Sequence, residues 1–158
     1  MPARWLAPLV ALALAAAAAA QTSPPAQTPQ ELFEKALVQD EGTTPTIRSL
    51  LQTDAAFVAP TFADLTADGK MDAIVQVRMP GAAGTVAAYV LSTDGTSDGR
   101  LRTVFRSQAL YRATIAVSSG ALVVTVPRYA RGDAVCCPAE SARRTYAWDA
   151  RTHRLRRR

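Results

Sequence analysis

Residues 73–91, AIVQVRMPGAAGTVAAYVL, decide the fold of this chain. Two runs of apolar and β-branched residues, Ala73 to Met79 and Thr85 to Leu91, stand on either side of a short segment that contains Pro80 and two glycines. Runs of this length and composition, bounded by Gly and Pro, are typical of β-strands. The connection is too short for a parallel crossover, which needs roughly a dozen residues, so the two strands are predicted to be antiparallel neighbours.

Further segments with period-two hydrophobicity follow, and we expect about six strands in one antiparallel β-meander. Val86 to Leu91 is apolar on both faces, which predicts a central position in the sheet. Phe57 to Phe62 is interpreted as an extended connector. The remaining strands are predicted at Leu101 to Arg106, Tyr111 to Val117, Ala121 to Val126 and Arg144 to Trp148.

The segment ahead of the strands carries helix signals. Thr28 can cap a helix, Pro29 suits its first position, and Glu31 completes a capping box. A second, shorter helix is predicted from Pro45 to Gln52. The sequence therefore predicts an α+β fold in which an N-terminal helix or two pack on the antiparallel meander.

The first 20 residues have the three parts of a cleavable export signal. Arg4 provides a positive charge, Trp5 to Ala20 is uncharged and apolar, and the final three alanines offer small residues to a signal peptidase. The alternative is an uncleaved anchor, but this run spans only about 24 Å of the roughly 30 Å hydrocarbon core. We expect cleavage near Ala20–Gln21, a disordered lead at residues 21–27, and one domain at residues 28–158 that is periplasmic, held in the cell envelope or secreted.

Charge is distributed unevenly along the chain, whose net charge is +5. Residues 21–98 contain 10 acidic and 4 basic residues, a net charge of −6, whereas residues 99–158 contain 13 arginines and 3 acids, a net charge of +10. Arginine contacts carboxylates and phosphates in a bidentate manner, so an anionic partner is one hypothesis. The simpler interpretation, which we prefer for the charge pattern alone, is that the two halves fold against each other and neutralise part of this charge.

Residues 64–72, DLTADGKMD, place oxygen-bearing residues at alternate positions around Gly69. A tight loop that wraps Ca²⁺ has this arrangement. Thr66 stands where Asp or Asn is usual, and position 12 is Val75 instead of a bidentate Glu. The alternative is a structural Asx-turn that leads into the next strand. The predicted metal ligands are Asp64, Thr66, Asp68, the Lys70 carbonyl and Asp72.

This loop also carries a resemblance to known proteins. The stretch FADLTADGKMDAIVQV is similar to the Asp-rich loop of FG-GAP and VCBS repeats, in a single copy. Together with a later segment, it resembles a group of small exported bacterial proteins of unknown function typified by the LppP/LprE-type lipoproteins. The resemblance spans residues 62–148 and implies export but no known activity, and the chain lacks the lipobox cysteine. The matching residues of the later segment are Gly132-Asp133, Cys136-Cys137-Pro138, Tyr146 and Trp148.

Cys136 and Cys137 are the only cysteines of the chain, and they are adjacent. In an oxidising compartment such a pair is normally a disulfide. Adjacent Cα atoms lie about 3.8 Å apart, below the usual range that begins at roughly 4.4 Å, so a vicinal bridge is strained and easily reduced. We predict this vicinal disulfide, and the alternatives are two buried thiols, a soft-metal site or an intermolecular bridge.

The sequence contains no recognisable catalytic set, so we expect no enzymatic activity and no cofactor other than Ca²⁺. His153 is the single histidine, and it lies among arginines near the C-terminus. A Ser/His or Cys/His pair therefore has no evident base. A hydrolase that uses the carboxylates of Asp64, Asp68 or Asp133 is a third hypothesis.

These features together predict an exported, non-enzymatic binding or interaction domain of the cell envelope, with a structural calcium-binding domain as the alternative. Arg102 and Arg112 are predicted to form the binding surface, for an anionic envelope polymer or another envelope protein. The arginines lack the interleaved aromatic residues of a nucleic-acid binder, so we expect no nucleic-acid partner. We also expect a monomer without a transmembrane segment in the mature chain, because no later stretch reaches about 18 apolar residues.

Overall fold

Two helices open the part of the chain that the computed structural model describes, residues 27–158. They are α1 (Pro29–Gln39) and α2 (Pro45–Gln52). The amide of Glu31 donates to Thr28 Oγ1 at 3.3 Å and the amide of Thr28 donates to Glu31 Oε2 at 2.8 Å, so the predicted capping box is confirmed. The predicted export signal and residues 21–26 of the predicted lead lie outside the described residues.

The strands of residues 27–158 form two antiparallel sheets of four strands each. This confirms the α+β class, whereas the expectation of a single meander of about six strands was wrong. Sheet A has the order β1-β2-β3-β4, and its strands are β1 (Phe57–Ala63), β2 (Asp72–Met79), β3 (Gly84–Ser92) and β4 (Arg102–Gln108). Sheet B has the order β5-β6-β7-β8, and its strands are β5 (Thr114–Ser118), β6 (Ala121–Arg128), β7 (Glu140–Asp149) and β8 (Arg154–Arg157). A short 3₁₀ helix, η1 (Gly81–Ala83), joins β2 to β3.

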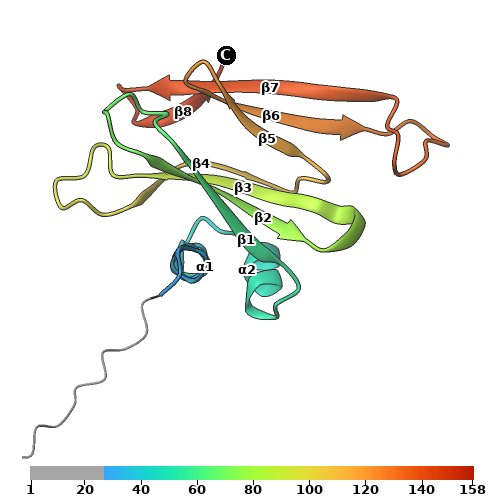
Figure 1. Ribbon diagram of the computed structural model, residues 1–158, viewed down its shortest axis with the longest axis horizontal. Helices are drawn as coiled ribbons and strands as arrows, with labels where there is room; N and C mark the ends of the chain where they lie inside the picture. The colour runs from blue at the N-terminus through green and yellow to red at the C-terminus, as the bar shows by residue number, and fades with distance from the viewer. Residues whose placement is uncertain (1–26) are drawn as a thin grey trace, which may run out of the picture.

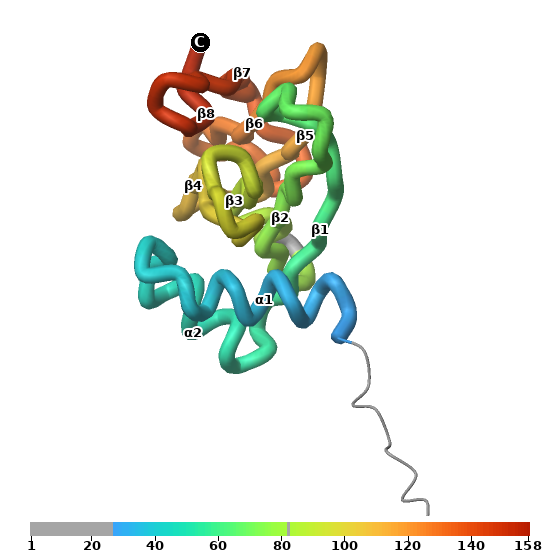
Figure 2. Tube along the Cα trace, turned by 90° about the vertical axis from the view of Figure 1, so that its left-hand side faces the viewer, coloured from blue at the N-terminus to red at the C-terminus, as the bar shows by residue number. Residues whose placement is uncertain are grey.

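Sheet A is the middle of three layers, with the helices on one side and sheet B on the other (Figure 1; Figure 2). One core lies between the helices and sheet A, where Val75 and Tyr89 contact helix residues such as Leu37. The second core lies between the sheets, where Val90 packs with Leu122. Because β2 and β3 are covered on both faces, their sequences are apolar at nearly every position. Among the described residues, no helix is both long and apolar enough to cross a membrane.

Two of the strands were not predicted. β1 was interpreted as a connector, but it pairs with β2 along its whole length. It contains Pro60, which a strand tolerates at the edge of a sheet because no neighbour needs its missing N–H. β8 has one buried residue, Leu155, which lies opposite Trp148 between exposed arginines. A single apolar residue in an arginine run is too weak a signal to predict a strand.

The linker between the two sheets, residues 109–113, determines where Arg112 lies. Residues 109–113 run back along the beginning of β3, where the amide of Leu110 donates to the Val86 carbonyl at 2.8 Å. The amide of Arg112 donates to the Ala83 carbonyl at 2.9 Å. Ala109 and Arg112 have φ values of 64° and 52°, in the left-handed region that turns the chain sharply. The linker therefore fixes Arg112 where the first strand of sheet B begins.

Candidate functional site: the outer face of sheet B

Sheet B has an inner face, which packs on sheet A, and an outer face, which points away from it. Leu122, Val124 and Leu155 lie on the inner face in the core between the sheets. Because side chains alternate along a strand, the residues between them lie on the outer face. The register places Thr114, Thr125 and Arg143 opposite one another across three strands of this face. By the same pairing, the outer face comprises Thr114, Ala116, Ser118, Ala121, Val123, Thr125, Pro127, Ser141, Arg143, Thr145, Ala147, Asp149, Arg154 and Arg156.

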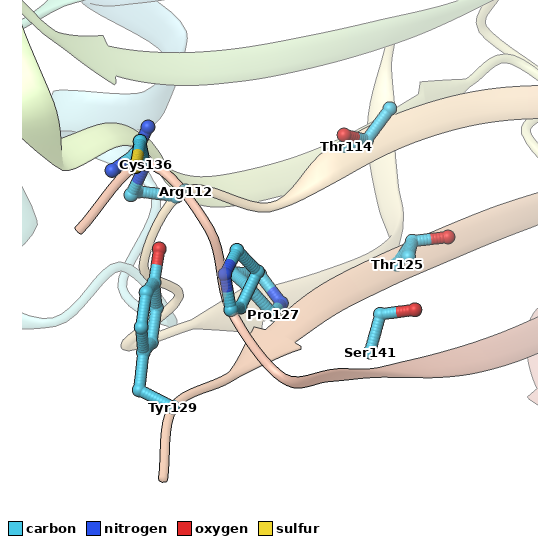
Figure 3. A pocket seen from close by; sticks show the side chains of 8 residues that line it. Arg112, Thr114, Thr125, Pro127, Tyr129, Cys136 and Ser141 are labelled. Atoms are coloured by element: carbon cyan, nitrogen blue, oxygen red, sulfur yellow. The ribbon is translucent and has the colours of Figure 1, made fainter. Parts of the chain in front are cut away.

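A cavity of about 270 Å³ lies at one end of the outer face, and we call it the Arg112 pocket (Figure 3). Hydroxyl groups from three neighbouring strands line one side of it, and Arg112 and Cys136 lie together at the other. The pocket is open to solvent, and most of its lining side chains carry a polar group although their apolar atoms make up the larger part of its surface. Its lining residues are Arg112, Thr114, Thr125, Pro127, Tyr129, Cys136, Pro138 and Ser141.

The far wall of the pocket belongs to the cysteine loop, residues 129–139, which connects β6 to β7. Asp133 closes the neck of this loop, because its Oδ2 accepts hydrogen bonds from the amides of Ala130 at 2.7 Å and Ala139 at 2.9 Å. These two hydrogen bonds, that of Ala139 first, hold the pKa of the Asp133 carboxyl below its usual 3.8. One carboxylate therefore fixes both ends of the loop.

Arg112 and Tyr129 hold the tip of the cysteine loop against the sheet. The Arg112 guanidinium donates to the Val135 carbonyl through Nη1, and the Tyr129 hydroxyl donates to the same carbonyl at 3.1 Å. The ring of Tyr129 packs edge-on against Tyr111, with centroids 5.9 Å apart. A guanidinium has five N–H donors, and Nη1 is the one nitrogen of this group with an acceptor among the described residues. The other donors are available to a ligand in the pocket.

Cys136 and Cys137 are free thiols, and both residues are exposed. They lie in a tight turn that is closed by a hydrogen bond from the Cys137 amide to the Ala134 carbonyl at 2.9 Å. The hydrogen bond with Cys136 raises the pKa of the Cys137 thiol, and the charge of Arg112 opposes this shift. Cys136 is thus part of the pocket wall, neither cysteine belongs to a core, and the vicinal disulfide stays a prediction.

The Arg112 pocket brings together two features that the sequence singled out separately, Arg112 and the cysteines. Arg102 lies elsewhere: it is opposite Ser92 at the end of β3, whereas Arg112 lies beside Gly84 at its beginning. The nine residues of β3 span about 26 Å, so the two arginines do not share one binding surface. Arg102 instead donates through Nη2 to the carbonyls of Asp94 and His153, each at 3.3 Å.

The pocket-lining hydroxyl residues and Tyr129 were missed by the analysis of the sequence. Thr114 and Thr125 sit at polar positions of strands whose alternate residues are apolar, which is a signal for a solvated face, whereas Ser141 lies in a strand with charged residues on both faces. That signal does not indicate which strands become neighbours. The side chains form a site only because the register aligns β5, β6 and β7.

The Asp-rich loop adopts the structural turn that was considered as its alternative role. Asp72 is 1% exposed, and its Oδ2 accepts from the amides of Leu65 at 2.8 Å and Thr66 at 3.0 Å. Asp64 accepts from the amides of Ala67 and Gly69. Asp68 accepts from the Thr66 hydroxyl at 3.2 Å and from the Lys70 amide at 2.9 Å, so these residues also bond within the loop. Among residues 27–158, no three His, Cys, Asp or Glu side chains are grouped so as to hold a metal ion.

Calcium titration tests whether the loop also binds a metal. Because its carboxylates already accept hydrogen bonds from the loop's own amides, we expect millimolar Ca²⁺ to leave the melting temperature unchanged. A site at a tenfold excess of Ca²⁺ over Kd would instead gain about 1.4 kcal/mol. A rise in melting temperature that Asp68→Ala abolishes would contradict this expectation and support the calcium-binding alternative.

A second test concerns the neck of the cysteine loop. We expect Asp133→Asn to speed amide hydrogen exchange at Ala130 and Ala139, because a neutral amide is a weaker acceptor for both N–H groups. Since the folded pKa is lowered, this contribution of Asp133 is present above about pH 3.8 and is lost as the pH falls through the folded pKa. Exchange measured by NMR at two pH values checks this, with the exposed Glu140→Gln as control. Equal exchange in both variants would show that Asp133 does not hold the neck.

No protein-family model, curated protein or solved structure matches the chain. The resemblance to the LppP/LprE-type lipoproteins therefore stays a prediction, and the function has to be inferred from the site.

Proposed function

We propose that the chain is an exported, non-enzymatic binding domain of the cell envelope whose ligand is an anionic polymer, bound along the outer face of sheet B. The observation that carries the proposal is the charge of this face. Arg143, Arg154 and Arg156 are exposed on it, and Arg112 lines the pocket at its end. Asp149 is the one acidic residue that the strand register places there among the described residues.

Asp149 offsets part of this positive charge at the end of the face next to β8, where it also closes the turn before that strand. It accepts from the Thr152 hydroxyl at 2.8 Å and from the Arg151 amide at 3.1 Å. These contacts, the Thr152 hydrogen bond first, lower the pKa of its carboxyl. Arg156 Nε lies 3.9 Å from the same carboxylate. Asp149 also lies opposite Arg154 in the register, whereas Arg143 lies opposite Thr125 and has no acidic partner on this face among the described residues.

The hydroxyl groups of the face favour a phosphate- or carboxylate-bearing polymer over a purely apolar partner. Thr114, Thr125 and Ser141 can donate to anionic oxygens or accept from sugar hydroxyls. Arginine supplies the bidentate contact that such oxygens prefer. The Arg112 pocket is large enough for one acidic group, and the rest of the face extends along four strands. This geometry suits a repeating ligand with one anchored unit.

The non-enzymatic part of the proposal is supported by the separation of the reactive groups. His153 lies 3.1 Å from Asp94 through Nδ1 and Oδ2, at the end of β3 opposite to the thiols. The carboxylates of the Asp-rich loop are hydrogen-bonded to that loop. Export is supported by the leader sequence at residues 1–20.

The test is binding of the purified protein to polygalacturonate and to polyphosphate, with neutral dextran as the control polymer. We expect salt-sensitive binding to an anionic polymer and none to dextran. Arg143→Glu should weaken it by about tenfold, equivalent to about 1.4 kcal/mol, because a charge-assisted contact becomes a repulsion. Arg112→Gln should have a similar effect.

Arg100→Glu is the matched control, because it makes the same charge change on the exposed loop between β3 and β4. It should leave the affinity within about twofold if the outer face of sheet B is the binding site. Equal losses in Arg100→Glu and Arg143→Glu would mean that only net charge matters. Binding that is absent for both polymers would overturn the proposal and leave a protein partner as the hypothesis to pursue.

A further inference from the structure

The cysteine pair lies where a change in its oxidation state can affect the binding pocket. Both thiols are free and exposed, so a soluble reagent or another protein has access to them. Cys136 lines the Arg112 pocket, and the charge of Arg112 acts on Cys137. Figure 3 shows Cys136 next to Arg112 at the rim. Neither cysteine belongs to either hydrophobic core.

The link between the thiols and Arg112 is the carbonyl of Val135. This carbonyl accepts hydrogen bonds from both Arg112 and Tyr129, and its carbon is bonded to the nitrogen of Cys136. A rotation of the peptide groups around Cys136 therefore moves the acceptor that holds the guanidinium. The turn from Ala134 to Cys137 depends on one backbone hydrogen bond of 2.9 Å.

Closing a disulfide between adjacent residues requires such a rotation. The Cα atoms of neighbours in a trans chain are fixed about 3.8 Å apart, below the roughly 4.4–6.8 Å of ordinary disulfides. An S–S bond between them therefore forms only if the torsions on both sides of the intervening peptide bring the two Sγ atoms together. We infer that Cys136 and Cys137 are a reversible dithiol–disulfide site, oxidised by disulfide-bearing molecules, and that oxidation releases Arg112 from Val135 and weakens anion binding in the pocket. The effect on ligand affinity rests on the proposed function, whereas the oxidation and the release of Arg112 do not.

The oxidation is a thiol–disulfide exchange in two steps. The Cys136 thiolate attacks one sulfur of the external disulfide, which forms a mixed disulfide and expels the first thiol. The Cys137 thiolate then attacks Cys136 Sγ, which closes the vicinal bond and expels the second thiol. Two cysteine thiols lose two electrons and two protons, and the external disulfide gains them as two thiols.

Cys136 is placed first in this sequence because its side chain lines the open pocket, whereas Cys137 does not. The strained product is easily reduced by excess thiol, which makes the site reversible.

The experiment treats the purified protein with oxidised glutathione and then with excess reduced glutathione. Intact mass should show a loss of two hydrogen atoms on oxidation and their return on reduction. Cys136→Ser and Cys137→Ser cannot close the bond, so each should at most carry a glutathione adduct. Because both side chains are exposed, serine should leave the melting temperature unchanged, which confirms that the controls are folded.

The side-chain Nε–H signal of Arg112, assigned by its loss in Arg112→Gln, reports on the pocket without any ligand. We expect it to shift on oxidation of the native protein and to stay in place in the two serine variants. Affinity for polygalacturonate or polyphosphate should fall by about tenfold, the same loss that we expect for Arg112→Gln. A mass that never loses two hydrogens, or a vicinal disulfide that leaves the Arg112 signal unmoved, overturns the inference. If the Arg112 signal shifts on oxidation but neither polymer binds the reduced or the oxidised protein, the proposed function is wrong and the redox site is still supported.

Discussion

Replacing Asp72 with alanine is expected to lower the free energy of unfolding by about 4 kcal/mol. Its carboxylate is buried and accepts the amides of Leu65 and Thr66. These two residues are themselves only 2% and 5% exposed, so neither amide can turn to water when its acceptor is removed. A buried N–H without a partner costs about 1–3 kcal/mol, and the substitution leaves two. Urea unfolding followed by circular dichroism measures the change.

Asp68→Ala is the matched control from the same loop. Asp68 accepts from the exposed Lys70 amide, which solvent can satisfy after the substitution. It also accepts from the Thr66 hydroxyl at 3.2 Å, which lies 3.5 Å from Asp72 Oδ1 as well and so keeps an acceptor. We expect Asp68→Ala to lower the free energy of unfolding by less than about 1 kcal/mol. Asp72→Asn should fall between the two, since it retains one acceptor oxygen. Equal losses for Asp68→Ala and Asp72→Ala would show that burial of Asp72 does not set the stability of the loop.

The sequence predicted those elements that carry their own local signals. The capping box of α1 and the period-two runs of β2 and β3 depend on residues close in the chain. The division into two sheets has no such signal, because it depends on the linker at residues 109–113. The left-handed turns in that linker occur at Ala109 and Arg112, residue types that do not favour them, so sequence reasoning placed β5 in the first sheet.

The sequence predicted some residues of the candidate site but not which of them lie together. Arg112 and the cysteines were recognised from residue chemistry alone, but their meeting depends on the fold. Arg102 was grouped with Arg112 because both were expected on one face of a single sheet. With two sheets, Arg102 binds the turn before β8 and Arg112 binds the cysteine loop. Knowing residue types was therefore sufficient to nominate the groups and insufficient to say which of them act together.

Tyr89→Ala is the second substitution with a large expected effect, a loss of about 3–5 kcal/mol in the free energy of unfolding. Tyr89 is fully buried on the helix-facing side of β3. Its hydroxyl donates to Gln108 Oε1 at 2.9 Å, and the same oxygen accepts the Thr44 amide at 2.7 Å. Gln108 Nε2 donates to the Gly42 carbonyl at 3.0 Å. The alanine would leave a cavity and remove the contact that joins β3 to this network.

Tyr89→Phe separates the hydroxyl from the ring. It retains the packing of the ring, so the free energy of unfolding at neutral pH should fall by only about 1 kcal/mol. Burial raises the pKa of the Tyr89 hydroxyl above its usual 10.0, so its contribution is fully present below about pH 10 and is lost as the pH rises through the folded pKa.

Alkaline unfolding followed by circular dichroism therefore distinguishes the variants. Tyr89→Phe should shift the transition to higher pH, whereas the exposed Tyr111→Phe should leave it in place. The difference arises because the phenylalanine has no proton to lose, and the folded state then avoids placing a phenolate in the core. Coincident transitions for the two variants would mean that another group controls alkaline unfolding and that Tyr89 contributes to stability by packing alone.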